Sequence, residues 1–92
     1  MATHEFTFEM ALPHQSDSEA MVAELAAAVL GYVGYAPDAI ADLTAKMCGA
    51  VADTMARGQR GCRVAFRAQD GEMQIAVTND GTARWHTARP LP

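Results

Sequence analysis

The sequence predicts an α+β fold: a two-layer sandwich in the order β-α-α-β-β, with both helices on one face of a three-stranded antiparallel or mixed sheet. Three observations predict it. Apolar residues alternate near the N-terminus, they recur at three- and four-residue steps in the middle, and Asp70-Gly71 separates two further alternating runs. A chain of 92 residues has room for one domain. We expect an ordered core over about residues 5–81 and an irregular tail over 82–92.

The first strand is expected at Phe6–Leu12, where every second residue is apolar, and Pro13 ends it. Ser16 and Glu19 have the spacing of a capping box, so a helix should begin there and run to about Val33. Its apolar stripe comprises Val22, Leu25, Ala26, Val29 and Val33.

The other face of this first helix carries little polarity, because Glu24 is the only charged residue between Ala20 and Tyr35. A helix that is apolar nearly all round favours burial on more than one side. Two interpretations stay open: a second molecule covers the outer face, or its alanines simply tolerate water.

Gly34 suits the position after a helix end, and Pro37 suits the first turn of the next helix. The second helix has apolar residues at helical spacing: Ile40, Leu43, Met47, Val51 and Met55. On its opposite face, Asp42 precedes Lys46 and Asp53 precedes Arg57 by four residues, the favourable order for ion pairs. Gly58 should end the helix.

A hairpin follows from Gly61, with Asp70-Gly71 as its two-residue turn. Asn79-Asp80-Gly81 should break the second strand, and the residues from Thr82 onward show no clear period. The side chains expected to face the helices are Phe6, Phe8, Val64, Phe66, Ile75 and Val77.

Charge is distributed unevenly along the chain. Residues 1–56 contain eight acids and one lysine (−7), whereas residues 57–92 contain six arginines and three acids (+3), which gives the net charge of −4. An acidic chain without a dense basic stripe argues against a nucleic-acid partner. The apolar segment Ala20–Ala36 is too short to span a membrane, and residues 1–10 lack the features of a signal peptide, so we expect a cytoplasmic protein.

No motif for metal or cofactor chemistry is found. Cys48 and Cys62 are not spaced as metal ligands and are expected to be reduced thiols. His4, His14 and His86 are best interpreted as surface histidines. No nucleophile elbow or phosphate-binding glycine run is present, so we expect no cofactor and no metal.

Arg60, Arg63 and Arg67 are the candidate partner-binding residues. Arg63 and Arg67 should project from one face of a strand, opposite Val64 and Phe66. Guanidinium groups there could bind a carboxylate-rich surface through bidentate hydrogen bonds. The alternative is an ordinary solvated sheet face.

A strand ending in Leu12-Pro13, two helices, a hairpin and then Val77–Gly81 resembles the front of the anti-sigma serine-kinase group of bacteria, within the histidine-kinase-like (Bergerat-fold) ATPases. The resemblance covers about residues 5–83. It implies a second helix that carries a Glu and, four residues on, a Mg²⁺-binding Asn. It also implies an Asp-x-Gly-x-Gly motif, whose Asp recognises adenine.

The chain departs from this pattern at the residues that matter most. Cys48 stands where the family has the Glu, and Ala52 stands where it has the Asn. Asn79 replaces the adenine-reading Asp, Gly81 matches the first glycine, and Ala83 replaces the second. The resemblance therefore implies a shortened, degenerate member in which Asn79 and Gly81 are vestigial cofactor-binding candidates.

We accordingly expect a non-catalytic regulatory or protein-binding module that resembles an anti-sigma factor kinase domain without its ATPase residues. Its partner would be a protein, sigma-like or antagonist-like, and the exposed sheet edges and the apolar first helix favour a homodimer. Two alternatives remain: a residual nucleotide-binding protein or kinase, and a small structural subunit of a homo-oligomer.

Overall fold

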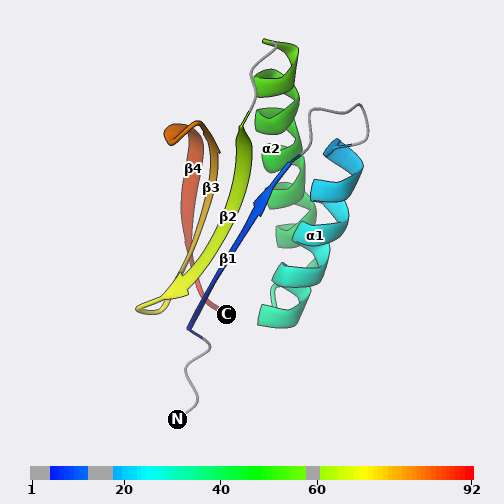
Figure 1. The fold of residues 1–92 in the computed structure, drawn as a ribbon. Helices are drawn as coiled ribbons and strands as arrows, with labels where there is room; N and C mark the ends of the chain where they lie inside the picture. Colours follow the sequence, from blue (N-terminus) through cyan, green and yellow to red (C-terminus); the bar gives the residue numbers. More distant parts are fainter. Residues whose placement is uncertain (1–4, 13–17, 58–60) are drawn as a thin grey trace.

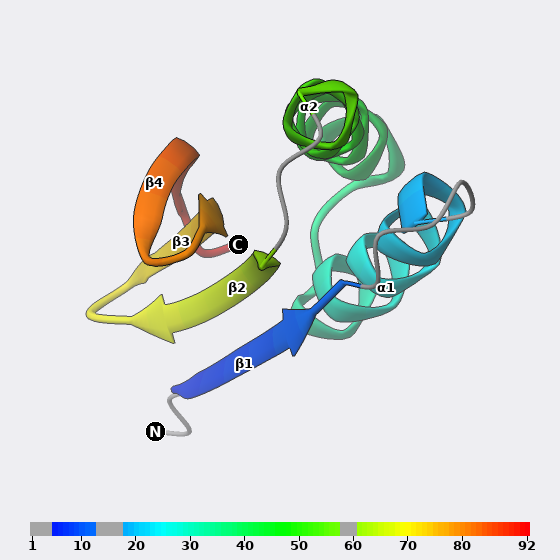
Figure 2. The same cartoon turned by 45° about the horizontal axis from the view of Figure 1, so that its top comes forward.

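The computed structural model describes residues 5–12, 18–57 and 61–92 (Figure 1). The elements follow the order β-α-α-β-β-β. Their bounds are β1 Phe6–Ala11, α1 Ser18–Val33, α2 Pro37–Ala56, β2 Cys62–Gln69, β3 Glu72–Asn79 and β4 Thr82–Pro90. The four strands form one antiparallel sheet in the order β1-β2-β3-β4. Figure 2 shows both helices on one side of this sheet, with α1 beside α2 and near the edge strand β1.

The predictions of a three-stranded sheet and of an irregular tail are wrong, because Thr82–Pro90 forms a fourth strand, β4. The Asp80-Gly81 turn before β4 has the same backbone geometry as the predicted Asp70-Gly71 turn between β2 and β3. Asp70 and Gly71 have φ angles of 55° and 75°, and Asp80 and Gly81 have 49° and 82°. Positive φ at both central residues matches the right-handed twist of a hairpin. Asp80-Gly81 therefore continues the sheet instead of ending it.

Long-range contacts hold β4 and the end of the chain against the helices. The Arg89 guanidinium donates to the Asp42 carboxylate at 2.7 Å, and the Tyr35 hydroxyl donates to the Pro90 carbonyl at 2.8 Å. Half-buried Trp85 packs against the core on the same side. Pro90 is tolerated because it lies at the end of an edge strand.

Both helices are found where the sequence predicts them. After α1, the backbone N–H groups of Gly34 and Tyr35 both donate to the Leu30 carbonyl at 3.1 Å, and Gly34 has a φ of 108°. Pro37 opens α2 as expected. The predicted capping residue Ser16 and the predicted terminator Gly58 lie outside the described residues. Neither described helix is long and apolar enough to cross a membrane.

The predicted ion pairs on α2 are also present. The Lys46 ammonium lies 3.2 Å from the Asp42 carboxylate, and the Arg57 guanidinium lies 3.2 Å from that of Asp53. All four side chains are about half exposed or more, so each pair adds little to stability.

The core lies between the helices and the central strands β2 and β3. Buried side chains come from every second residue of β2 and β3 and from one stripe of each helix; the largest are Phe66, Leu30, Leu43, Met47, Met73 and Ile75. Of the six side chains predicted to face the helices, four are fully buried: Val64, Phe66, Ile75 and Val77. Phe6 is half-buried, whereas Phe8 keeps 40% of its surface exposed. The core therefore thins out toward β1.

Candidate functional site

Cys48, which the resemblance aligns with a conserved Glu of the kinases, contacts the start of α1. Its Sγ lies 3.5 Å from the Glu19 carbonyl, to which it donates a weak hydrogen bond. Burial, followed by the nearby Glu19 charge, raises the pKa of the Cys48 thiol. A thiol with a raised pKa holds little thiolate near neutral pH, so Cys48 is poorly suited to act as a base or a nucleophile.

The other nucleotide-related positions do not supply a set of ligands. Ala52 is half-buried on α2, and its methyl group has no atom that could coordinate Mg²⁺. Asn79 ends β3 with 6% of its surface exposed, on the side of the sheet that holds Val77. Gly81 lies in the turn to β4. These residues do not fit ATP with Mg²⁺, because Asn79 alone offers a side-chain polar group suited to the purpose.

Histidine and cysteine side chains are common ligands of transition metals. His86 is exposed on β4, and His4 and His14 lie outside the described residues. Over residues 5–12, 18–57 and 61–92, no three His, Cys, Asp or Glu side chains are grouped closely enough to hold a metal ion. Cys48 and Cys62 are free thiols, and burial also raises the pKa of Cys62.

The face of the sheet opposite the helices presents the predicted arginines. Strand β2 alternates between buried and exposed residues, so Arg63 and Arg67 both project from this open face. Neither forms an ion pair with a carboxylate of the described residues, in contrast to Arg57 and Arg89. Arg60, the third candidate, lies outside the described part of the chain.

A shallow depression of about 330 Å³ lies beside Arg67 on this open face. Ala65 and Ala76 are paired across β2 and β3 and form its floor, because their small side chains leave space above the sheet. The depression is completed by Thr7, Glu9, Arg67 and Gln74. A partner could therefore approach the sheet closely between the two arginines.

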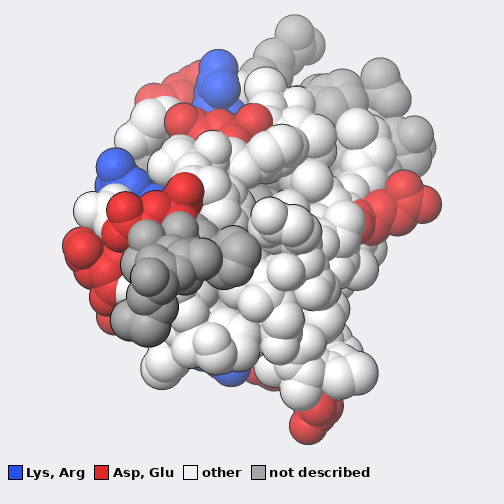
Figure 3. Space-filling model, turned by 90° about the horizontal axis from the view of Figure 1, so that it is seen from below, with Lys and Arg blue, Asp and Glu red and all other residues white. Residues whose placement is uncertain are grey.

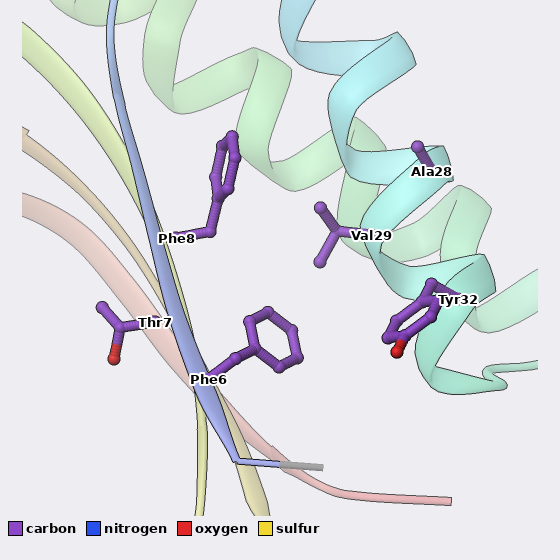
Figure 4. A pocket seen from close by; sticks show the side chains of 6 residues that line it. All are labelled: Phe6, Thr7, Phe8, Ala28, Val29 and Tyr32. Carbon is purple, nitrogen blue, oxygen red and sulfur yellow. The ribbon is translucent and has the colours of Figure 1, made fainter.

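A second surface feature, which the sequence did not predict as a site, is an apolar groove of about 430 Å³ between β1 and α1. In Figure 4, Phe6 and Phe8 extend from β1 toward Val29 and Tyr32 of α1, while Thr7 points the other way. Tyr32 is 74% exposed. The signal available in the sequence was the nearly uncharged first helix, which indicated missing cover without showing where the gap lay.

None of the six residues that line the groove is charged. Figure 3 views the molecule from the end that holds the start of β1 and the end of α1, and a wide area there shows no Lys, Arg, Asp or Glu. The groove itself is lined mainly by apolar side chains, and exposed apolar patches mark interaction surfaces more often than isolated exposed residues do.

Comparisons with protein families, with curated proteins and with solved structures found no match. The resemblance to the anti-sigma serine kinases therefore stays a prediction based on the quoted residues.

Proposed function

We propose that this chain is a non-catalytic regulatory module that binds an acidic surface of a partner protein on the open face of its sheet. The observation that carries the proposal is the pair Arg63 and Arg67, two exposed guanidinium groups that no described carboxylate neutralises. Unpaired arginines on a rigid strand are suited to bidentate recognition of carboxylates, because little conformational freedom is lost when the bonds form.

The spacing of the two arginines supports a protein partner. Residues four apart on a strand are separated by about 13 Å, which is close to the distance between carboxylates eight residues apart on a helix. Ala65 and Ala76 lie between them and leave room for the backbone of an approaching segment. An acidic helix laid along β2 over the open face would contact both guanidinium groups at once.

The resemblance to anti-sigma kinases favours a regulatory role in the cytoplasm and a sigma-like or antagonist-like partner. The residue set at Cys48, Ala52 and Asn79 favours binding without catalysis, because it does not fit a nucleotide with its metal ion. Calorimetric titration with MgATP tests this part of the proposal. Micromolar, Mg²⁺-dependent binding would contradict it.

The docking surface is tested with a synthetic helical peptide that carries glutamates at positions i and i+8. We expect Arg63→Glu and Arg67→Glu each to weaken its binding about tenfold, because a charge-assisted hydrogen bond is lost in each case. Arg57→Glu is the control, since it makes the same charge change at the residue that follows α2, away from the open face. Equal binding by all variants would refute the proposed surface.

The natural partner is then sought by comparing cross-linked complexes formed in lysate by the wild-type chain and by the two charge-reversal variants. We expect the relevant partner to carry an acidic segment and to be lost from both variants but kept by Arg57→Glu. A captured set that does not respond to Arg63 or Arg67 would place the binding surface elsewhere.

A further inference from the structure

We propose that two copies of this chain associate through the free edges of β1, extending the two sheets into one and closing the apolar groove between β1 and α1. This inference does not depend on the proposed function, because it concerns the edge of the sheet rather than its open face. It specifies the surface, the orientation and the register of a homodimer.

The backbone groups available for pairing follow from the register of β1 with β2. The Leu12 N–H donates to the Cys62 carbonyl at 2.9 Å, and the same register pairs Phe8 with Phe66. Because hydrogen-bonded pairs alternate in an antiparallel ladder, the even-numbered residues of β1 bond to β2. The N–H and C=O groups of Thr7, Glu9 and Ala11 therefore point away from the sheet.

The two edges of the sheet differ in how they resist pairing. β4 contains Arg84, Arg89 and Pro90, and its register shifts between Val77 and Thr78. Charges, proline and irregular register are common devices against edge-to-edge association. β1 has no proline and keeps one register along its length, with Glu9 as its only charged residue. β1 is therefore the edge that can accept another strand.

The apolar groove borders this same edge. Phe6 and Phe8 lie on the helical side of β1, and Val29 and Tyr32 face them from α1 (Figure 4). A twofold axis perpendicular to the sheet at β1 would place α1 of both copies on the same side. The exposed surfaces of Phe8 and Tyr32 would then be covered by the equivalent residues of the second copy, which explains why α1 is apolar nearly all round.

Charge selects one register. If Phe8 lies opposite Phe8 of the second copy, Glu9 faces Thr7 and Glu5 faces Ala11, so no like charges meet. A shift by two residues in one direction would oppose Glu9 with Glu9, and a shift in the other would oppose Glu5 with Glu9. Like charges directly across an antiparallel pair are destabilising, whereas aromatic pairs are favourable. The edge is therefore self-complementary in the Phe8-centred register, which favours a second copy over an unrelated strand.

Sedimentation equilibrium of the full chain tests the association. We expect a mass of twice 9.8 kDa for the wild type at high protein concentration. Glu9→Pro removes an outward N–H that β2 does not use, so the monomer should still fold while dimer dissociation becomes at least tenfold easier. Glu9→Thr keeps that N–H and should remain dimeric. A wild-type monomer, or equal dissociation constants for the two variants, would overturn the proposal.

Oxidative cross-linking tests the register. In the Phe8-centred register the two Phe8 positions form a non-hydrogen-bonded pair with Cα atoms about 4.5 Å apart, a separation that a disulfide can bridge. Phe8→Cys should therefore form a covalent dimer in air. Phe6→Cys is the matched control, because its two copies would be about 14 Å apart and should not cross-link. Cross-linking by Phe6→Cys alone, or by neither variant, would contradict this arrangement.

Discussion

Strand β4 was not expected from the sequence, and Trp85 provides a direct test of its place in the fold. Trp85 pairs with Val77 across β3 and β4 and lies half-buried against the core. Truncating a fully buried tryptophan to alanine costs about 3–5 kcal/mol of unfolding free energy. Because Trp85 is only half-buried, we expect Trp85→Ala to cost about 2 kcal/mol, which lowers the Tm of a domain of this size by about 10 °C.

The measurement is thermal and urea unfolding followed by far-ultraviolet circular dichroism, since Trp85 is the only tryptophan and the variant has no fluorescence probe. His86→Ala is the matched control. His86 is the next residue of β4 and is exposed on the open face, so its loss should change the unfolding free energy by less than about 0.5 kcal/mol. If Trp85→Ala is as mild as His86→Ala, β4 does not stabilise the domain and the reasoning fails.

Three further predictions concern other parts of the molecule. The Thr44 hydroxyl is buried without a hydrogen-bond partner among the described residues. Thr44→Val should therefore raise the free energy of unfolding, measured by urea denaturation, by about 1 kcal/mol, and a lower free energy of unfolding would contradict this. Hydrogen bonds from Arg89 and then from Lys46 lower the pKa of Asp42 below its ordinary value of 3.8. The ionised carboxylate therefore stabilises the fold at pH values above 3.8, and this stabilisation is lost as the pH falls through the lowered pKa. The Tm of the wild type should therefore fall more steeply below about pH 4 than that of Asp42→Asn, and parallel curves would exclude the effect. Burial raises the pKa of the Cys62 and Cys48 thiols, so both should react with iodoacetamide more slowly than free cysteine near neutral pH. Cys62 should be the slower of the two because it is buried, and rapid labelling of Cys62 would show that the core opens.

Most of the fold could be predicted because its elements carry local signals. Helix α2 has a helical apolar period, Pro37 at its start and two ion pairs that the structure confirms. The hairpin of β2 and β3 has alternating residues around Asp70-Gly71. These patterns arise within a few residues of each other, so a single sequence is enough to recognise them.

β4 was not predicted because the contacts that stabilise it join residues far apart in the sequence. Its residues that face the helices are Trp85, Thr87 and Arg89, of which one is apolar, so no apolar alternation marks the strand. Arg89 and Pro90 are held by Asp42 and Tyr35, residues more than 45 positions earlier. The hairpin signal was nevertheless present, since Asp80-Gly81 repeats the Asp-Gly pair of the preceding turn.

The open face with Arg63 and Arg67 was predicted from the sequence, whereas the groove between β1 and α1 was not, for a similar reason. The exposure of Arg63 and Arg67 follows from the two-residue period of β2, which the sequence displays. The groove between β1 and α1 depends on how α1 lies against α2, and no local pattern determines that arrangement. Phe8 was expected in the core because alternation shows on which side of a strand a residue lies, but not whether anything covers it.

The connection between β1 and its neighbour has a consequence for how the chain assembles. β2, β3 and β4 are joined by two-residue turns, whereas β1 reaches β2 only after both helices, so that Phe6 pairs with Ala68. Nearby segments meet quickly, and contacts between residues distant in sequence form slowly. We therefore expect the three-strand meander to form first, with β1 joining last and detaching most readily. In native-state hydrogen exchange, the amides of β1 would then open at a lower free energy than those of β3. The last strand to join the sheet would then be β1, the same edge strand at which we propose that a second copy binds.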